Sequence, residues 1–417
     1  MAKSEVVAGL DLGSGRVACV IGEPDPEGNG VRILGGASVP CRGVKGGVVI
    51  NIQDAQRSIR QAVEAAEKQA GDVMVHGVYL GVRGAHLESF NNRGAYNIAR
   101  TDKEITAEDV SAVVENAKAI PISNDREILH VIPQGFGLDR QRGVPDPVGM
   151  EGSLLEVEVH IVTASSNHLN NLNRAVAEAG FEVLEAVYSP LALGDFLVTP
   201  EERDLGSMLV DMGGQSTSIV VYSEGSVRFT KEIDLGTDSI TRDLAVGLQT
   251  HMPTAERLKV EHGVAHPGLM NGSADEPVTF KGLDGRSERQ ARVAVLTDII
   301  LPRVEEILTI VGETVQGSNY GDVVLPCGAV LTGGGAMMKG FPEAAKQVLN
   351  MSSRLGLAHS GIITAPDNLL EPTFSTALAL VSYPQSSLYR STGVIGQQMN
   401  TVALSALSWD TTVEAQP

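Results

Sequence analysis

The sequence reads Gly9-Leu10-Asp11-Leu12-Gly13-Ser14-Gly15 near its start and Leu209-Val210-Asp211-Met212-Gly213-Gly214-Gln215-Ser216 midway, and each turn separates two apolar, strand-like runs. An aspartate and glycines at the bend of a β-hairpin place a carboxylate beside exposed backbone N–H groups. Glycine allows the tight bend and a close phosphate approach that a Cβ atom would block. Each turn alone is also compatible with an ordinary glycine hairpin. Their matching places predict two related halves whose hairpins face each other and clamp a phosphate.

A third glycine cluster, Thr332-Gly333-Gly334-Gly335-Ala336, follows the apolar run from 323 to 331 and precedes a helix-like stretch. A strand-to-helix turn of this kind suits a nucleotide, because it exposes backbone N–H groups to the phosphates. The neighbouring Met338 offers apolar surface for an adenine ring. Together the three turns predict an α/β fold of the actin type, built from duplicated ribonuclease-H-like domains, that binds ATP.

The candidate site combines these turns with one helical pair. We expect Asp11 and Asp211 to hold Mg²⁺ mainly through water molecules. Glu256 and Lys259 lie three residues apart, so they either reach the nucleoside or form a solvated surface pair, and the spacing favours the surface pair. The remaining residues expected at the phosphates belong to the two aspartate turns and the glycine cluster: Gly13, Ser14, Gly15, Arg16, Gly213, Gly214, Gln215, Ser216, Gly333, Gly334 and Gly335.

Composition excludes several classes of protein. The chain has 32 Lys and Arg residues against 51 Asp and Glu residues, a formal net charge of −19. This charge argues against general nucleic-acid binding and against attraction to anionic lipids. The three cysteines lack CxxC spacing, which is typical of a reduced cytoplasmic protein rather than a disulfide framework or zinc knuckle. With no apolar signal segment or spanning stretch, we expect a chain that is neither exported nor membrane-spanning.

Other well-known motifs are missing from the sequence. It contains no G-x-x-x-x-G-K-[ST] loop and no G-x-G-x-x-G after the first strand, which argues against P-loop and Rossmann folds. His262 and His266 are four residues apart, but Gly263 intervenes and no Cys or carboxylate cluster accompanies them, so a metal site is not favoured. No Ser-His-Asp or Cys-His signature stands out.

Hydrophobic periodicity and turn residues predict the order of the elements. A helix capped by Asn51 follows the first three strands, and another capped by Thr106 lies in an inserted unit. Helices capped by Thr237 and Thr254, and a long one interrupted at Pro302, are expected in the second half. The expected strands are 6–12, 17–22, 31–39, 78–82, 128–132, 154–162, 181–186, 218–222, 227–233 and one within 277–284. The other expected helices are 166–180, 189–198, 237–249, 254–262, 287–315, 341–349 and 374–381.

Residues 5 to 383 resemble the FtsA family of bacterial cell-division proteins, which are divergent relatives of actin. The first turn contributes Asp11-Leu12-Gly13-Ser14, and an inserted region that generic actins and Hsp70 chaperones lack is more diagnostic. The stretches that carry the resemblance are Gly43-Val44-Lys45-Gly46-Gly47-Val48, Ala65-Ala66-Glu67, Ile105-Thr106-Ala107-Glu108-Asp109-Val110, Glu127-Ile128-Leu129-His130-Val131-Ile132-Pro133 and Pro147-Val148-Gly149-Met150-Glu151-Gly152.

The resemblance implies four subdomains. Subdomain 1A would comprise residues 1–76 and 164–205, with the FtsA-type subdomain 1C inserted as residues 77–163. Subdomain 2A would comprise 206–236 and 316–383, with 2B at 237–315, followed by a flexible C-terminal tail at 384–417.

The resemblance also implies a function. ATP would bind between 1A and 2A, and the chain would assemble into actin-like filaments. Subdomain 2B would bind the C-terminal tail of the tubulin-like protein FtsZ, where Arg292 and Arg303 suit an acidic peptide but are equally compatible with solvated helix charges. The protein would link the Z ring to the cytoplasmic face of the membrane at the division site, and 1C would recruit later division proteins.

Two departures from the family pattern bear on these expectations. The family usually ends in a basic amphipathic helix, whereas here no Lys or Arg follows Arg390 and Asp410 adds negative charge, so another membrane partner is expected to substitute. Related filaments carry a water-orienting Glu before a Pro-Leu pair, whereas this chain reads Ser189-Pro190-Leu191. We therefore expect tight ATP binding with slow or negligible hydrolysis.

Alternative functions on the same superfamily fold are a chaperone-type ATPase, a sugar kinase, and an actin-like assembly protein of a pilus or secretion machine. The chain ends soon after the helix at 374–381, which leaves no room for a client-binding domain, and no catalytic Asp for a sugar pocket is evident. The pilus or secretion protein would differ chiefly in its partner, and the stretch around Gly149-Met150 weighs against it.

Overall fold

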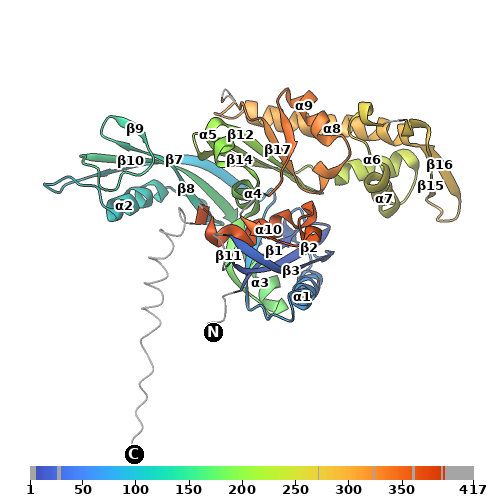
Figure 1. The fold of residues 1–417 in the computed structure, drawn as a ribbon, viewed down its shortest axis with the longest axis horizontal. Coiled ribbons are helices and arrows are strands. Elements are labelled where there is room, and N and C mark those ends of the chain that lie inside the picture. Colours follow the sequence, from blue (N-terminus) through green and yellow to red (C-terminus); the bar gives the residue numbers. More distant parts are fainter. Residues whose placement is uncertain are drawn as a thin grey trace, which may run out of the picture.

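The computed structural model describes residues 6–25, 30–270, 272–321, 323, 325–358, 362–386 and 388–389. Two sheets with hairpins of the same design form the centre of the molecule (Figure 1). Each of these sheets begins with an antiparallel hairpin, and the first strand of the hairpin pairs in parallel with a later strand. The predicted repetition of the two halves is therefore present.

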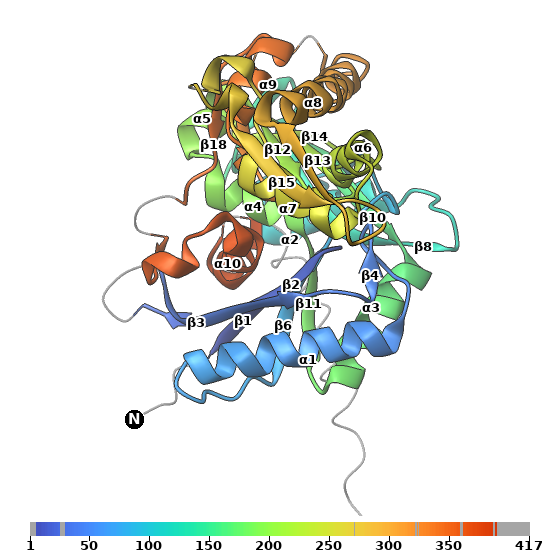
Figure 2. The same ribbon diagram turned by 90° about the vertical axis from the view of Figure 1, so that its right-hand side faces the viewer.

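The first sheet has six strands in the order β11-β6-β1-β2-β3-β19. Helices α1 and α3 lie on one of its faces, and α4 and α10 lie on the other (Figures 1 and 2). The strands are β1 (Val7–Leu12), β2 (Arg16–Pro24), β3 (Val31–Pro40), β6 (Gly77–Val82), β11 (Glu182–Tyr188) and β19 (Ile363–Thr364). The helices are α1 (Ile52–Gln69), α3 (Ser166–Ala179), α4 (Ser189–Leu197) and α10 (Ser375–Ser382), and the short strands β4 (Val44–Lys45) and β5 (Val48–Val49) precede α1.

Helix α1 begins where the sequence predicts. The Asn51 side chain accepts a hydrogen bond from the Asp54 N–H, which satisfies one of the unpaired donors of the first turn. Buried residues recur along the helix at the spacing of one face, namely Ala55, Ile59, Ala62, Val63 and Ala66. This face packs against β3 and β2 of the first sheet.

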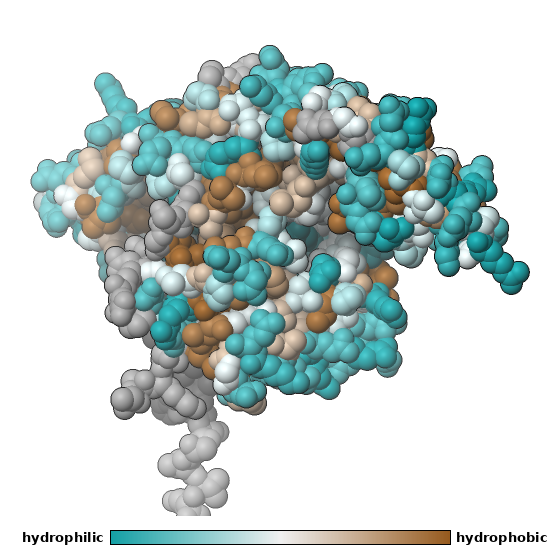
Figure 3. All heavy atoms as spheres, turned by 45° about the vertical axis from the view of Figure 1, so that its right-hand side comes forward, coloured by the Kyte–Doolittle hydropathy of each residue, from teal (hydrophilic) through white to brown (hydrophobic). Residues whose placement is uncertain are grey.

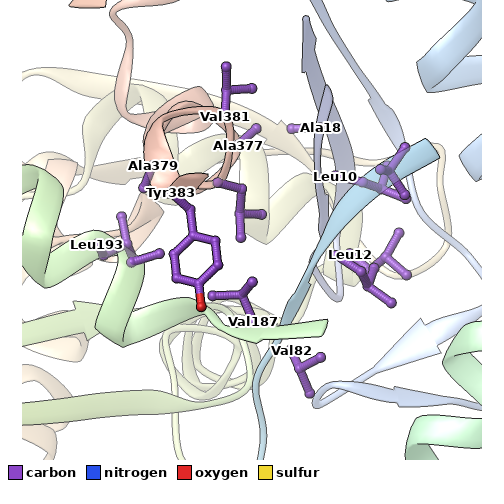
Figure 4. Packing of buried hydrophobic residues seen from close by; sticks show 14 of the residues in the cluster. Leu10, Leu12, Ala18, Val82, Val187, Leu193, Ala377, Ala379, Val381 and Tyr383 are labelled. Atoms are coloured by element: carbon purple, nitrogen blue, oxygen red, sulfur yellow. The ribbon is translucent and has the colours of Figure 1, made fainter. Parts of the chain in front are cut away.

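Helix α10 packs on β1, and Figure 4 shows buried side chains of the surrounding core. A Cβ atom on Gly9 would lie 2.3 Å from the carbonyl oxygen of Ala377, so the helix can approach only because residue 9 is glycine. The Tyr383 hydroxyl donates to Glu185 over 2.8 Å beside this core. The first residues of the predicted tail are also packed, because Leu388 is buried; residues 390–417, with the predicted C-terminal segment, lie outside the described residues.

The second sheet has five strands in the order β14-β13-β12-β17-β18. Helix α9 contacts β18, and α5 contacts β13. The strands are β12 (Ser207–Met212), β13 (Thr217–Ser223), β14 (Ser226–Ile233), β17 (Ala329–Thr332) and β18 (Ser353–Leu355), and the helices are α5 (Pro200–Leu205) and α9 (Phe341–Leu349). Both aspartate turns thus follow the first strand of a central hairpin.

The segment between β14 and β17 forms a mainly helical unit at one end of the molecule (Figure 1). Its elements are α6 (Asp238–Leu248), α7 (Met252–His262), β15 (Pro277–Lys281), β16 (Glu288–Arg292) and α8 (Val293–Gln316). The predicted helix start at 287 is wrong, because the Asp284 carboxylate accepts from the Arg286 and Ser287 N–H groups and closes a hairpin turn. Helix α8 also runs through Pro302 without the predicted interruption.

Of the two predicted threonine caps in this unit, the one at Thr237 is present and the one at Thr254 is wrong. Thr237 is the N-cap residue of α6, although its side chain makes no capping hydrogen bond. Helix α7 begins two residues before Thr254, because Pro253 lies in its first turn, where the fixed φ of proline favours helix initiation.

The inserted unit lies at the other end of the molecule and consists of a four-stranded sheet covered by α2 (Ala107–Lys118). Its strands, in spatial order, are β7 (Leu87–Asn97), β10 (Leu154–Ser165), β8 (Arg126–Leu138) and β9 (Gln141–Val144). Thr106 and Asp109 form the predicted capping box of α2. Strands β7 and β9 were not among the predicted elements. β7 carries a polar run through Ser89, Asn91 and Arg93 that lacks a strand-like apolar alternation.

The inserted sheet also contacts the second half of the molecule. Ser89 donates to the carbonyl oxygen of Thr230 over 2.8 Å, and Gln134 donates to that of Val227 over 2.6 Å. The unit is therefore anchored to β14 as well as to the first sheet. Within the described part of the chain, no helix combines the length and apolar character needed to cross a membrane.

Candidate functional site

A cavity of about 710 Å³ lies between the two halves of the molecule and is lined by residues of both. Figure 3 shows the recess between the upper and lower parts of the molecule. Every residue that the sequence analysis assigned to the nucleotide borders this cavity: Asp11, Gly13, Ser14, Gly15, Arg16, Asp211, Gly213, Gly214, Gln215, Ser216, Glu256, Lys259, Gly333, Gly334, Gly335 and Met338. The fold therefore brings together segments that are separated by more than 300 positions in the sequence.

The two aspartate turns have the same internal hydrogen bond. The Gly13 N–H donates to the Arg16 carbonyl oxygen over 3.0 Å, and the Gly213 N–H donates to the Ser216 carbonyl oxygen over 2.9 Å. In the first turn, the Ser14 hydroxyl also accepts from the Gly46 N–H over 2.9 Å. Successive backbone N–H groups in turns of this kind can form anion-binding concavities, and one turn lies on each side of the cavity.

The third turn depends on glycine for a steric reason. Gly333 follows β17 with φ of +83°, and a Cβ atom there would lie 2.4 Å from Asp211 Oδ1. Gly335 packs equally tightly, because its Cβ atom would lie 2.4 Å from the Met212 side chain. The turn therefore closes directly over the second aspartate.

Lys259 and Glu256 do not form the solvated surface pair that the sequence favoured. Lys259 is buried, and its Nζ atom lies 2.8 Å from Glu256 Oε2. The same ammonium group donates to the Thr241 hydroxyl over 2.8 Å and to the Thr237 carbonyl oxygen over 3.2 Å. The surface interpretation was wrong because α6 packs on α7 and covers this face.

Arg83, which was not among the predicted site residues, lies between the two aspartates. Arg83 Nη2 is 3.5 Å from Asp11 Oδ1, and Nη1 is 3.0 Å from Asp211 Oδ2. Nη2 also donates to the Thr376 hydroxyl over 3.0 Å. No pattern in the sequence marks this residue, since a single arginine after a short apolar strand is common; only the fold brings it to both turns.

Several buried ionisable groups surround this arginine. Burial raises the pKa of Asp11, an effect that Arg83 opposes and Asp211 reinforces. Burial also raises the pKa of Glu232 to about 7, although hydrogen bonds from Ser218 and Tyr188 and the charge of Arg83 act against the rise. Burial disfavours the charge on Arg83, but Asp211, Asp11 and Glu232 together hold its pKa above the ordinary value. Arg83 is therefore a permanent cation at the centre of the site.

Mg²⁺ between Asp11 and Asp211 remains a prediction, and the described side chains do not fit it as they stand. The Arg83 guanidinium already lies within 3.5 Å of both carboxylates and would repel a second cation in the same space. In the described residues, no group of three or more His, Cys, Asp or Glu side chains is arranged to hold a metal ion.

Ser189 lies apart from the cavity. Its side chain is fully buried at the start of α4, and its Oγ makes no hydrogen bond with the described residues. It is not among the residues that border the cavity. The position that carries a water-orienting Glu in related filaments therefore offers no group to a water molecule here.

The two arginines expected to bind a peptide lie in the helical unit and are not among the residues that border the cavity. Arg303 on α8 pairs with Asp243 of α6 over 2.7 Å and also with Glu306. Arg292 at the end of β16 is largely exposed and pairs with Asp275 over 3.2 Å. Both arginines thus have carboxylate partners within the chain.

Comparison with known proteins agrees with this architecture. Residues 84–163 match the family model of the SHS2 domain inserted in FtsA, and residues 208–379 match that of the cell division protein FtsA. The cell division protein FtsA of Pseudomonas aeruginosa is 34% identical over 379 residues, which cover 91% of this chain and 89% of that protein. The chain belongs to the FtsA family.

Two further FtsA proteins show the same extent of similarity. FtsA of Borreliella burgdorferi is 37% identical over 91% of this chain and 90% of its own length. FtsA of Escherichia coli K12 is 34% identical over 92% of this chain and 91% of its own length. The family match thus extends through both halves and the inserted unit.

Solved structures share the fold at much lower sequence identity. A PilM-PilN type IV pilus biogenesis complex aligns with a TM-score of 0.63 at 16% identity, covering 90% of this chain and 97% of the other. MreB5 of Spiroplasma citri bound to ADP aligns with a TM-score of 0.53 at 11% identity, covering 86% and 93%. This FtsA-family chain therefore has an α/β actin-like fold with the SHS2 insertion, as the sequence predicted.

Proposed function

We propose that this chain is an ATP-binding adaptor of the cell-division machinery. The observation that supports ATP binding is the pair of aspartate–glycine turns, with matching hydrogen bonds, that face each other across one cavity beside the Gly333 turn. MreB5 of Spiroplasma citri, which shares the fold, is bound to ADP in one structure and to AMPPNP in another. The phosphates would lie between the two turns, with the adenosine towards α7 and Met338.

Hydrolysis of the bound ATP is expected to be slow. Water positioning distinguishes a fast nucleotide hydrolase from a binder, and Ser189 is buried away from the cavity. We expect phosphate release from purified protein with saturating ATP at about 0.01 per second or slower, the range of unassisted nucleotide hydrolases. A rate of about 1 per second or more, which is ordinary for enzymes, would contradict this prediction.

As an adaptor, the chain would bind the C-terminal tail of FtsZ, form actin-like filaments and link the Z ring to the cytoplasmic face of the membrane. Membership of the FtsA family supports a role in division, and the inserted unit would recruit later division proteins. Arg292 and Arg303 would release their carboxylate partners within the chain and pair with acidic residues of the tail peptide instead. Another membrane-bound partner would hold the assembly at the division site.

Peptide binding can be tested with a labelled peptide from the C-terminal tail of the same organism's FtsZ. We expect saturable binding that Arg303→Glu weakens by about tenfold or more, since loss of a charged contact costs roughly 1.5 to 3 kcal/mol. The matched control is Arg174→Glu, which reverses the charge of one partner in the Arg174–Glu178 ion pair of α3, in the first half of the molecule. Absence of binding by protein that is saturated with ATP, or equal loss in both variants, would contradict the proposed role.

A further inference from the structure

The guanidinium of Arg83 lies between Asp11 and Asp211, where the sequence predicted a metal ion. We propose that Arg83 neutralises Asp11 and Asp211 and binds the nucleotide phosphates in place of a divalent cation, so that this chain binds ATP with little dependence on Mg²⁺. The proposal rests on the ATP site described above.

The contacts of Arg83 extend to both halves of the molecule. One Nη atom lies 3.5 Å from Asp11 at the end of β1, and the other lies 3.0 Å from Asp211 at the end of β12. Nη1 is also next to the second turn, because a Cβ atom on Gly213 would lie 3.8 Å from it. A single cation thus faces both places where the proposed site exposes phosphate-binding N–H groups.

The backbone around Arg83 is fixed by close packing. Gly84 has φ of +114°, and a Cβ atom there would lie 2.3 Å from the Gly46 carbonyl oxygen. The Gly84 N–H donates to the Glu232 carboxylate over 3.3 Å, and the opposite oxygen of that carboxylate accepts from the Tyr188 hydroxyl over 2.8 Å. The backbone that carries Arg83, directly after β6, is therefore fixed beside the site.

Arg83 also retains capacity to bind an anion. Its side chain borders the cavity and is only 13% exposed. Its Nε atom is buried and makes no hydrogen bond with the described residues. Asp211 Oδ2 also makes no hydrogen bond with them and is held only by its ion pair with Arg83. A planar guanidinium has several donors in a geometry that matches a phosphate group. Lys259, which is also buried at this cavity, is already engaged by Glu256, Thr241 and Thr237.

The experiment measures the dissociation constant of a fluorescent ATP analogue in Mg²⁺ and in EDTA. For the natural chain we expect EDTA to weaken binding by about threefold or less, and for Arg83→Gln by about thirtyfold or more, because the variant must recruit a metal ion between two carboxylates. The control is Arg93→Gln, which removes an exposed arginine on β7 and should behave as the natural chain. Equal effects of EDTA on the natural chain and on Arg83→Gln would overturn the proposal.

A second measurement needs no nucleotide. Mg²⁺ should raise the melting temperature of Arg83→Gln, which leaves Asp11 and Asp211 uncompensated, but not that of the natural chain. If Arg83→Gln does not fold, the measurement on the natural chain alone still tests the proposal. A loss of ATP affinity of about thirtyfold when EDTA replaces Mg²⁺ would overturn the role of Arg83. ATP binding that strictly requires Mg²⁺ would leave the proposed function intact, whereas no ATP binding in either condition would refute the proposed function as well.

Discussion

Replacing Gly333 by alanine is expected to abolish ATP binding and to destabilise the second half of the molecule. The new methyl group would lie 2.4 Å from Asp211 Oδ1 and 2.5 Å from the Met212 carbonyl oxygen, in a backbone conformation with φ of +83°. A left-handed conformation and overpacking together cost about 2 to 4 kcal/mol. The free energy of unfolding and the affinity for ATP both measure the effect.

The neighbouring glycine provides a matched control. A Cβ atom on Gly334 would have no heavy atom within 4 Å, and its φ is not positive. Gly334→Ala should therefore retain the stability of the natural chain and fold normally. Similar behaviour of the two variants would show that the Gly333 turn does not close over Asp211 as described.

The contribution of Glu232 to folding is expected to decrease as the pH rises from about 4.5 to 7, so Glu232→Gln should gain stability relative to the natural chain across this range. The buried His86, His130 and His160, whose pKa values are lowered by burial, act in the opposite direction in both proteins and cancel in the comparison. The pKa of Glu232 is about 7 in the folded protein, mainly because of burial, against an ordinary value of 4.5. In this range the folded chain keeps a proton that the unfolded chain releases, so folding is favoured at low pH and the advantage is lost as the pH approaches 7. The difference between the two pKa values corresponds to about 3 kcal/mol.

The measurement is the free energy of unfolding by denaturant at pH 5 and at pH 7.5 for the natural chain and the variant. Glutamine keeps the side chain neutral and can still hydrogen bond to Tyr188 and Gly84. Glu313→Gln, an exposed substitution on α8, controls for the loss of one carboxylate. If the free energies of unfolding of the natural chain and of Glu232→Gln differ by the same amount at both pH values, Glu232 is not protonated in the folded protein.

Much of the fold could be predicted from sequence because its key positions are local. Asp11 and Asp211 with their glycines determine a hairpin within a few residues, and the repetition reveals the relation between the halves. The Asn51 cap and the buried face of α1 are likewise encoded within a few turns of helix. These features depend on neighbours along the chain rather than on tertiary contacts.

The predictions failed at positions where tertiary contacts determine the surroundings of a side chain. Lys259 is buried only because α6 covers α7, and Arg83 becomes part of the site only when β6 lies beside β1. Glu232 lies on a strand of the second sheet but accepts a hydrogen bond from Tyr188 at the end of the first. Neither spacing nor residue type along the chain indicates which partner such a charged side chain will meet.

We propose that ATP phosphates bind between the two aspartate turns, and crystals of the protein with a non-hydrolysable ATP analogue would test this proposal. We expect electron density for the terminal phosphates between residues 13–15 and 213–215, in contact with Arg83 and with backbone N–H groups that the turns do not use internally. A nucleotide bound elsewhere, or a cavity without nucleotide density at saturating concentration, would contradict it.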